Sequence, residues 1–484
     1  MKLMTHLIVC LPLLLATAQA NDQVKPAMVK IYCISNAPDY YNPWSMKGPR
    51  SSTGSGVIID GKRILTNAHV VSNQTYIQLR RFGMAQRVEA RVLAVSHHAD
   101  LALLTVDDPS FFEGVAPIEL GTLPETQKDV LVYGFPLGGD TLSTTKGVVS
   151  RIEHILYAHS SLQLLGGQID NAINPGNSGG PVISDGKIAG VVMQTLGDAD
   201  NIGYMVPVTV VEHFLDDLKD GTYDGFPSLG IKLQDMENPD LKRKYKVDLT
   251  TTGVLITQVL PGAPADGILR VGDVVTHIED HDIANDGTIE FRPDERTSLS
   301  HAVQQHQVGD TVKAVVLREG QEQELAIKLT RISDADLLVP HEQYDLPPAY
   351  FVYGGLVFCP LSKNLLKEWG KSWYNNAPKH LVAEITDNTA REEKDEIIVL
   401  LKVLASSMNQ GYHTLNMMII EEANGTTLRG LKHLSELCED PNAGPFIELE
   451  SSTGRIIVLD RQKARDTRDP LLQIYRIKTD RGGF

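Results

Sequence analysis

The sequence has few cysteines and few aromatic residues. Cysteine occurs four times in 484 residues, and aromatic side chains make up 6% of the chain. Beyond Cys10, the three cysteines Cys33, Cys359 and Cys438 are widely spaced, which is not the pattern of a disulfide framework. At most one pair can form, and the sequence does not say which. The spacings CxxC and HExxH do not occur, so no motif supports a metal site.

Long basic tracts and nucleotide-binding motifs are missing as well. The formal net charge is −16, and the densest basic cluster, Lys242–Lys246, is short and isolated. Binding to nucleic acid or to an anionic membrane therefore has little electrostatic support. Gly56, Gly61 and Lys62 match the bare GxxxxGK spacing, but Arg63 follows where a Ser or Thr would hold Mg²⁺. We expect no nucleotide, no metal and no other cofactor.

The first twenty residues differ in composition from the rest of the chain. Lys2 precedes an apolar run over Leu7–Leu15, and Ala18-Gln19-Ala20 follows with small residues at cleavage spacing. The run is far shorter than the ~20 residues that span a bilayer. We predict a signal peptide over residues 1–20 and an exported protein, periplasmic or secreted. An uncleaved anchor is the alternative, and no second hydrophobic segment of spanning length follows.

The rest of the chain reads as three β-rich parts. Short β-type runs separated by Gly, Asn, Asp and Pro fill residues 27–215 and predict an all-β barrel or sandwich. A helical pattern over Val208–Leu218 ends this part. A second β-rich unit with a helical stretch over Thr297–Gln307 occupies residues 228–331. The third covers 349–484, where a short helix over Gly430–Cys438 follows the turn dipeptide Asn424-Gly425.

The segment from Asn174 to Pro181 holds the most chemistry. A serine hydroxyl is a poor nucleophile and needs a base to take its proton. Ser178 stands between Gly176 and Gly179, and glycines allow a tight turn that brings the N–H groups of Gly176 and Ser178 together. Such paired donors stabilise an oxyanion. The alternative for this segment alone is a glycine-rich surface turn.

Two upstream residues favour a catalytic interpretation of that segment over a surface turn. His69 follows the β-type run Arg63-Ile64-Leu65, and Asp100 abuts the apolar run that begins at Leu101. Taken singly, each is better explained as a loop or strand-end residue. Together with Ser178, however, they give the order His, Asp, Ser within one β-rich unit. This is the order of double-barrel serine proteases and not that of subtilisins or α/β-hydrolases.

The blocks TNAHVV, HADLALL and NPGNSGGPV resemble the active-site segments of the HtrA/Deg family of serine proteases. The segment Gly272–Val275 resembles the "GD" strand turn of the family's first PDZ domain. The segment Ile283–Thr288 is most similar to the plant-type Deg branch, which has two PDZ domains. The resemblance implies a mainly β chain, with a chymotrypsin-like double β-barrel over residues 21–220. A PDZ domain over 226–331 and a divergent PDZ-like domain over 340–484 follow.

The resemblance also implies roles for individual residues. Ser178 would be the nucleophile, His69 the general base and then acid, and Asp100 the group that orients His69. The amides of Gly176 and Ser178, together with Asn177, would form the oxyanion hole.

A primary specificity pocket is implied by the same resemblance. We expect cleavage after small or medium apolar side chains, because the residues implied for the pocket include no acid. They are Ile173, Ile202, Gly203, Tyr204 and Met205.

In the first PDZ domain, the loop Ser228-Leu229-Gly230-Ile231 resembles the family's peptide-carboxylate loop. A peptide C-terminus would bind beside the helix at Thr297–Gln307 as an added strand. In the last domain, Tyr353–Phe358 matches that loop only loosely, so this domain is expected to serve assembly.

Two local features leave alternatives open. The aromatic residues Tyr40, Tyr41 and Trp44 either pack in a trimer interface, as the family implies, or belong to an ordinary core. The pair His97-His98 beside Asp100 is expected to be a solvated loop and not a metal site.

The predicted function is an ATP-independent serine endopeptidase that degrades or processes unfolded exported proteins in protein quality control. Its partners would be unfolded polypeptides and peptide C-termini, and it would form trimers or multiples of trimers. The alternative is a peptide-binding chaperone or scaffold whose protease domain rests. A dedicated processing protease with one partner is a third reading that the sequence does not separate from the first.

Overall fold

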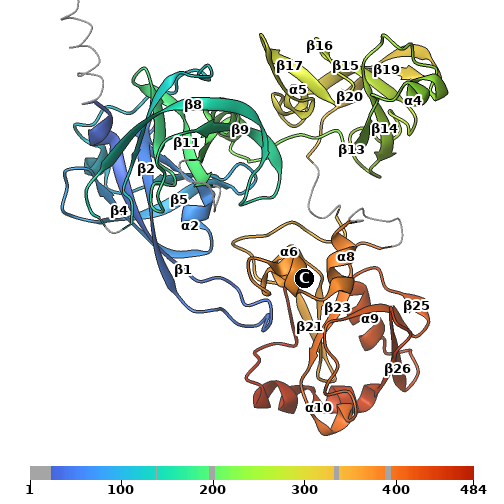
Figure 1. Cartoon of the computed structure of the whole chain (residues 1–484). Coiled ribbons are helices and arrows are strands. Elements are labelled where there is room, and N and C mark those ends of the chain that lie inside the picture. The colour runs from blue at the N-terminus through green and yellow to red at the C-terminus, as the bar shows by residue number, and fades with distance from the viewer. Residues whose placement is uncertain (1–22, 138, 196–201, 332–336, 387–393) are drawn as a thin grey trace, which may run out of the picture. The chain divides into compact units, whose positions relative to one another are not determined.

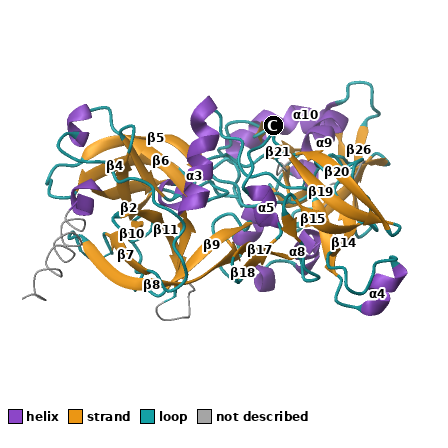
Figure 2. Ribbon diagram, turned by 90° about the horizontal axis from the view of Figure 1, so that it is seen from above, coloured by secondary structure: helices purple, strands orange, loops and turns teal. Residues whose placement is uncertain are grey.

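The computed structural model describes residues 23–137, 139–195, 202–331, 337–386 and 394–484. Residues 1–20, for which a signal peptide is predicted, lie outside this part. The chain divides into two compact units (Figure 1). The first holds the chain up to Ser35 and Arg50–Arg331, and the second holds Asn36–Pro49 and Ile332–Phe484. The fold is mainly β, as predicted, and the helices are short (Figure 2). No described helix is both long and apolar enough to cross a membrane.

The first unit opens with two closed barrels of six strands each. In the first barrel the order around the sheet is β1-β2-β3-β6-β5-β4. Strand β6 is buried along its whole length, which explains its unbroken apolar run. The strands of this barrel are β1 (Met28–Ser35), β2 (Arg50–Ile59), β3 (Arg63–Thr66), β4 (Gln74–Arg81), β5 (Val88–Ser96) and β6 (Leu101–Thr105).

The second barrel closes in the order β10-β11-β12-β9-β8-β7. The helix α3 (Val208–Asp217) follows it at the position that the sequence predicted. The short helices of the two barrels are η1 (Lys25–Ala27), α2 (Ala68–Val71), η2 (Pro109–Phe112) and η3 (Leu218–Asp220). The strands of the second barrel are β7 (Asp129–Gly134), β8 (Ser143–Leu156), β9 (Gln163–Ile169), β10 (Pro181–Ser184), β11 (Lys187–Thr195) and β12 (Gly203–Pro207).

The first unit continues with an antiparallel sheet in the order β13-β14-β15-β19-β20, in which β16 pairs with β15. Strands β17 and β18 form a separate hairpin. The helix α5 (Ser300–Gln304) is shorter than predicted, because Thr297 and Ser298 belong to β18. Its flanking Leu299 and its Val303 are buried against the sheet, as expected.

The elements of this sheet and hairpin are β13 (Ile231–Asp235), α4 (Pro239–Lys244), β14 (Val254–Val259), β15 (Val274–Ile278), β16 (His281–Asp282), β17 (Thr288–Arg292), β18 (Glu295–Ser298), β19 (Thr311–Arg318) and β20 (Gln321–Lys328).

The second unit contains an eight-stranded sheet in the order β27-β26-β24-β23-β22-β21-β28, with β25 paired to β24. Its strands are β21 (Tyr350–Tyr353), β22 (Leu356–Pro360), β23 (Ile398–Val403), β24 (Met418–Ala423), β25 (Thr426–Thr427), β26 (Phe446–Ser451), β27 (Ile456–Asp460) and β28 (Arg481–Gly482). Its helices are α6 (Lys363–Lys367), α7 (Trp373–Asn376), α8 (Lys379–Thr386), η5 (Ser407–Asn409), α9 (Leu431–Glu439) and α10 (Arg461–Ile474). The predicted helix after the Asn424-Gly425 turn is α9, whereas α10 was not predicted.

The connection between β1 and β2 belongs to the second unit, although both strands belong to the first. Its Trp44 ring lies edge-on to Tyr350 of β21, with ring centroids 6.0 Å apart. Its Tyr41 ring lies 5.6 Å from that of Trp369. Tyr40 and Trp44 pack against the hydrophobic core of this unit, which agrees with the core alternative for these two residues, whereas Tyr41 is 37% exposed. The trimer-interface alternative stays untested.

A lysine from the sheet completes this contact. Lys402 of β23 donates a hydrogen bond to the Asn42 side chain, at 2.8 Å, and its Nζ lies 5.6 Å from the centre of the Trp44 ring. A cation over an indole face is attracted by the ring quadrupole. Burial lowers the pKa of Lys402, which agrees with a position inside the packed contact.

The cysteines of the described chain are buried and carry thiols. Cys359 lies on β22 and Cys438 on α9, and burial raises the pKa of each to about 12. Neither forms a disulfide, which the sequence had left open.

Candidate active site

The first barrel joins His69 and Asp100. Asp100 stands just before β6 with a positive φ of 53°, and its side chain is 1% exposed. Its carboxylate accepts two hydrogen bonds from His69, one from the backbone N–H at 2.9 Å and one from ring Nδ1 at 2.7 Å. The Asn67 side chain donates to the Asp100 carbonyl at 2.8 Å. Because a carboxylate only accepts, Nδ1 carries the proton and Nε2 is left as a base.

The charges of this pair support each other. Burial alone would lower the pKa of His69, but the charge and hydrogen bond of Asp100 outweigh it and raise that pKa above its ordinary value. Burial likewise works against the ionised Asp100, but the charge and hydrogen bonds of His69 hold the pKa of this carboxyl below its ordinary value. The pair therefore favours a carboxylate beside an imidazole that readily accepts a second proton.

The turn before β10 carries Ser178 and depends on its glycines. Gly176 has φ of 99° and Gly179 has φ of 82°, a region that favours glycine. A Cβ added to Gly176 would lie 2.6 Å from the Phe135 carbonyl oxygen. One added to Gly179 would lie 2.1 Å from the Thr66 hydroxyl oxygen. Both sites therefore exclude a side chain by sterics as well as by backbone conformation.

The three amides predicted for an oxyanion hole differ. Within the described part of the chain, the N–H groups of Gly176 and Ser178 make no hydrogen bond. The N–H of Asn177 donates to the Asn174 carbonyl at 3.0 Å. Two of the three predicted donors are thus available to a ligand, and the third is already used by the turn itself.

The serine hydroxyl is not bonded to the histidine. Ser178 Oγ is half-buried and donates to the Met193 carbonyl over 3.5 Å, a long contact. No hydrogen bond links it to His69 among the residues with assigned positions. Nucleophile–base bonds are often loose in ligand-free sites and tighten on substrate binding.

Ser55 of β2 supports this turn and was missed from the sequence. Its backbone N–H donates to the Ser178 carbonyl at 2.9 Å, and its hydroxyl donates to the Gly176 carbonyl at 2.7 Å. The Phe135 N–H in turn donates to the Ser55 hydroxyl at 2.8 Å. One buried serine of the first barrel thus holds the nucleophile turn of the second. The only sequence signal for this role is that Gly54 and Gly56 flank Ser55, since glycines allow another backbone to approach closely.

The pair His97-His98 lies in a turn, as expected, but it is less solvated than expected. Both residues are half-buried, and His97 Nδ1 lies 2.9 Å from Nε2 of His159. The partner comes from the connection between β8 and β9, which the sequence could not place beside this turn. Among the described residues, no group of three or more His, Cys, Asp or Glu could hold a metal ion.

Two of the residues predicted for the specificity pocket are in close contact. Ile173 packs against Gly203, since a Cβ added there would lie 2.0 Å from the Ile173 Cδ1. Ile173 and Ile202 are partly buried against the barrel core. Tyr204 and Met205 on β12 are 5% and 0% exposed. An apolar lining remains our prediction for this pocket.

The predicted peptide loop lines a groove in the predicted first PDZ domain, which we call the α5 groove. Ser228, Leu229, Gly230 and Ile231 all border a small pocket of about 80 Å³, opposite α5. Among the described residues, the Leu229 amide makes no hydrogen bond. The next amide of the loop, that of Gly230, donates to the Ser228 hydroxyl at 3.3 Å. Carboxylate binding by this loop remains our prediction.

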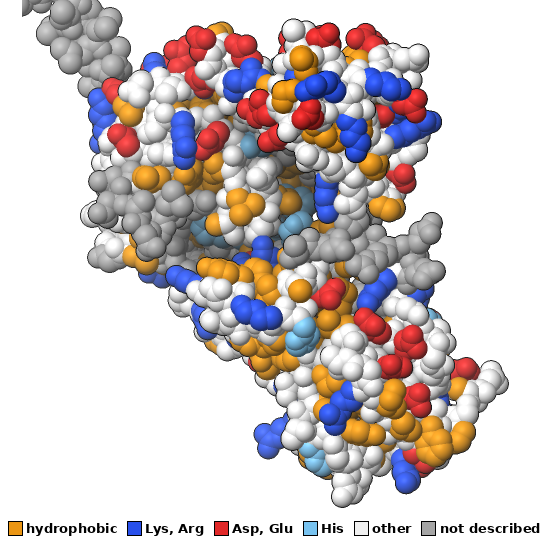
Figure 3. Space-filling model, turned by 45° about the vertical axis from the view of Figure 1, so that its right-hand side comes forward, with side chains coloured by type: hydrophobic (Ala, Val, Ile, Leu, Met, Phe, Trp, Pro, Cys, Tyr) orange, Lys and Arg blue, Asp and Glu red, His pale blue; other side chains and the backbone are white. Residues whose placement is uncertain are grey.

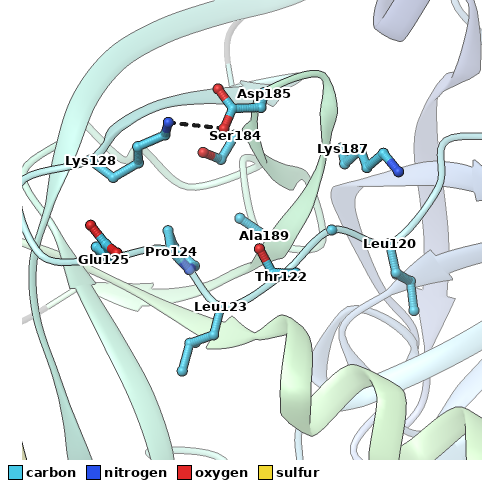
Figure 4. Close-up of a pocket in the computed structure, with 11 residues that line it drawn as sticks. Leu120, Thr122, Leu123, Pro124, Glu125, Lys128, Ser184, Asp185, Lys187 and Ala189 are labelled. Atoms are coloured by element: carbon cyan, nitrogen blue, oxygen red, sulfur yellow. Dashed lines mark ion pairs between the residues drawn. The ribbon is translucent and has the colours of Figure 1, made fainter. Parts of the chain in front are cut away.

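A larger pocket of about 440 Å³ lies on the outside of the second barrel (Figure 4). Its lining includes the ion pair of Lys128 with Asp185, at 2.9 Å. It contains none of the triad or α5-groove residues, and we assign it no role.

On one face of the molecule, charged side chains of both signs are mixed. Figure 3 shows Lys and Arg interspersed with Asp and Glu on the face in view. That face presents no continuous basic surface of the kind that nucleic acid binds.

Comparison with protein families agrees with the three parts of the chain. Residues 54–191 match the trypsin-like peptidase domain, and residues 227–329 and 339–482 each match a PDZ domain.

Similar proteins extend this along nearly the whole chain. It is 38% identical to the chloroplastic protease Do-like 2 of Arabidopsis thaliana over 463 residues, which are 94% of this chain and 74% of that protein. It is 37% identical to the mitochondrial protease Do-like 4 of the same plant, over 95% of this chain and 86% of that protein. Among solved structures, the HtrA-type protease AlgW with a tripeptide shares its fold. The TM-score is 0.52 and the identity 24%, over 65% of this chain and 97% of that one. The chain belongs to the HtrA/Deg family of serine proteases, within which it fits the plant Deg branch, and is a serine endopeptidase with two PDZ domains.

Proposed function

We propose that this endopeptidase works without ATP through a triad of Ser178, His69 and Asp100. The observation that carries the proposal is the 2.7 Å bond between His69 Nδ1 and Asp100. It lies in the same compact unit as a serine turn whose Gly176 and Ser178 amides make no hydrogen bond within the described chain. Acyl transfer to a serine needs a base and an oxyanion site, but no nucleotide.

The proposed steps follow from these atoms. Nε2 of His69 takes the proton of Ser178 Oγ as this oxygen attacks the peptide carbonyl, and Asp100 stabilises the imidazolium. The amides of Gly176 and Ser178 stabilise the oxyanion, and one such donor is worth about 3–4 kcal/mol. His69 then protonates the leaving amine, and water releases the acyl-enzyme. Before attack, Ser178 Oγ has to turn from the Met193 carbonyl towards His69.

The test is a Ser178→Ala variant assayed with casein, together with a fluorophosphonate probe and mapping of the labelled residue. We expect the variant to lose casein degradation entirely while it still binds peptide, and the wild-type label to lie on Ser178. Casein cleavage by the variant at the wild-type rate would show that the triad assignment is wrong.

The pH dependence of activity gives a separate check. The reaction needs His69 neutral, and its pKa is raised by Asp100. We expect kcat/KM to fall as the pH drops through a value above the ordinary histidine pKa of about 6.5. A profile that stays flat well below that value would argue against His69 as the base.

We propose unfolded polypeptides with apolar residues as substrates. Ile173 and Ile202 would accept a small or medium apolar side chain, and unfolded chains expose such side chains. A peptide library should show cleavage after such residues, and a preference for Lys or Arg would contradict the proposal.

Peptide C-termini would bind the α5 groove. The similar AlgW structures carry short peptides, which supports a peptide-binding role without locating one here. The proposed setting is protein quality control in an exported or organellar location, by trimers or multiples of trimers. Two Arabidopsis relatives are named as chloroplastic and mitochondrial. Cell fractionation and analytical ultracentrifugation test these two points.

A resting peptide-binding scaffold is the second candidate, and one observation favours it. Ser178 Oγ bonds to Met193 and not to His69. If the wild-type protein binds peptides but neither cleaves casein nor reacts with the probe under any condition, the scaffold is preferred. Proteins trapped by the Ser178→Ala variant would separate a general degrader from a processing protease with one partner.

A further inference from the structure

The connection between β8 and β9 carries a histidine that the proposed mechanism does not use. His159 is 9% exposed. The connection is fixed on both sides of it, because Tyr157 Oη donates to the Leu165 carbonyl at 2.5 Å and the Ser161 N–H donates to the Tyr157 carbonyl at 2.7 Å. The ring nitrogens of a buried imidazole need hydrogen-bond partners.

His159 is bound to a second imidazole. Nε2 of His159 lies 2.9 Å from Nδ1 of His97, and the ring centroids are 5.2 Å apart. One of the two nitrogens donates and the other accepts, so the tautomer of one ring determines that of the other. His97 lies three residues before Asp100, on the same turn. The bond therefore holds the β8–β9 connection against the turn that carries the acid of the triad.

The pair also lies beside the catalytic dyad. The His159 ring centroid is 6.2 Å from that of His69. A protonated His159 would lower the pKa of the Asp100 carboxyl, and burial together with the charge of Asp100 raises the pKa of Tyr157 well above its ordinary value. His159 and Tyr157, two side chains of one connection, therefore lie close enough to interact with the charge of the Asp100 carboxylate. Because this carboxylate is buried, electrostatic interactions with it are strong.

We propose that His159 is a positioning residue of the catalytic dyad, fixed by its hydrogen bond to His97 and packed beside His69 and Asp100. The inference rests on the proposed triad. His159 does not touch substrate in this proposal. It limits the movement of the His69 ring and the access of water to Asp100, so that Nδ1–H stays bonded to the carboxylate while Nε2 works as base.

The test compares variants at 159 and 97 with a short fluorogenic peptide substrate. Rates are normalised to the number of active sites that a fluorophosphonate probe titrates. We expect His159→Ala to lower kcat about tenfold with KM within twofold of wild type, and His97→Ala to do the same. The double variant should lose no more than either single one, because both remove one interaction. His98→Ala, on the same turn, is the matched control and should stay within twofold.

Conservative variants separate positioning from simple packing. His159→Gln keeps a polar group where Nε2 lies and should recover most of kcat, whereas His159→Phe keeps the ring but not the bond and should not. The NMR signal of the His69 Nδ1 proton, expected far downfield in wild type, should broaden in His159→Phe and return in His159→Gln.

The outcomes are distinguishable. Unchanged kcat in His159→Ala, additive losses with His97→Ala, or full recovery in His159→Phe would each overturn the positioning role. The triad itself would stand if wild type is labelled on Ser178 and His69→Ala is inactive. Absence of that label would instead remove the proposed triad, independently of any result at position 159.

Discussion

The two PDZ domains of this chain differ in whether a strand edge is open. In the first domain the strand after the glycine loop, β13, pairs only with β14 among the described residues. Its other edge faces α5 across the α5 groove. In the last domain the strand after Gly354-Gly355, β22, pairs with β21 on one side and β23 on the other. Strand β21 is itself paired with β28.

This difference bears on peptide binding. A peptide that adds as a strand needs an edge with unpaired N–H and C=O groups. The first domain offers that edge beside an apolar lining, and the last domain has already used both edges of β22. The same family description therefore covers one domain suited to peptide capture and one suited to packing. The assembly role predicted for the last domain is consistent with this, although no observation tests it.

The largest expected effect concerns the glycine turn before β22 in the last domain. In the last domain a Cβ on Gly355, which has φ of 87°, would lie 2.5 Å from the Leu404 carbonyl oxygen. We expect Gly355→Val to destabilise this domain by about 3–4 kcal/mol, through backbone strain and a clash with main chain. Thermal unfolding followed by calorimetry measures it. Gly444→Ala, with open space around it, is the control. A Gly355→Val protein as stable as this control would show that the turn is not tightly packed.

The second-largest expected loss of stability comes from the aromatic contact of the β1–β2 connection. Trp44→Ala removes a half-buried ring that packs on Tyr350 and lies near Lys402. We expect a loss of about 2 kcal/mol from the second unit, below the range for a fully buried Trp. Denaturant unfolding of the full chain measures it. Met46→Ala in the same connection, where the side chain is 51% exposed, should change stability little. Equal effects of the two would contradict the packing described here.

The smallest expected effect tests the open edge of the first domain. Ile231→Asp places a negative charge in the α5 groove, where it would repel a peptide carboxylate. We expect roughly tenfold weaker binding of a C-terminal peptide, about 1.4 kcal/mol, in a Ser178→Ala background by fluorescence anisotropy. Gln234→Asp adds the same charge to β13 outside the groove and should bind as wild type. If both variants bind equally well, peptides bind elsewhere and the comparison of the two domains fails.

Much of this protein could be predicted from local patterns. Glycine at 176 and 179 around a serine, and the chain order of His69, Asp100 and Ser178, are properties of neighbouring residues and of sequence order. They sufficed for the residues of the proposed triad, while the short β-type runs predicted the mainly β fold and the motif blocks around the three residues predicted the family. The segment Ser228–Ile231 could likewise be singled out, because it is one short stretch of sequence, and its role in carboxylate binding remains a prediction.

Other features were decided only by the tertiary structure. The bond of His97 to His159 joins residues 62 positions apart, and that of Ser55 to Gly176 joins residues 121 apart. The connection with Trp44 packs on Tyr350, which follows some three hundred residues later in the chain. No local period signals such pairs, because each partner is an ordinary polar or aromatic residue in its own segment. Which strand edges stay open depends on the pairing of whole strands, and that is settled when the sheets assemble.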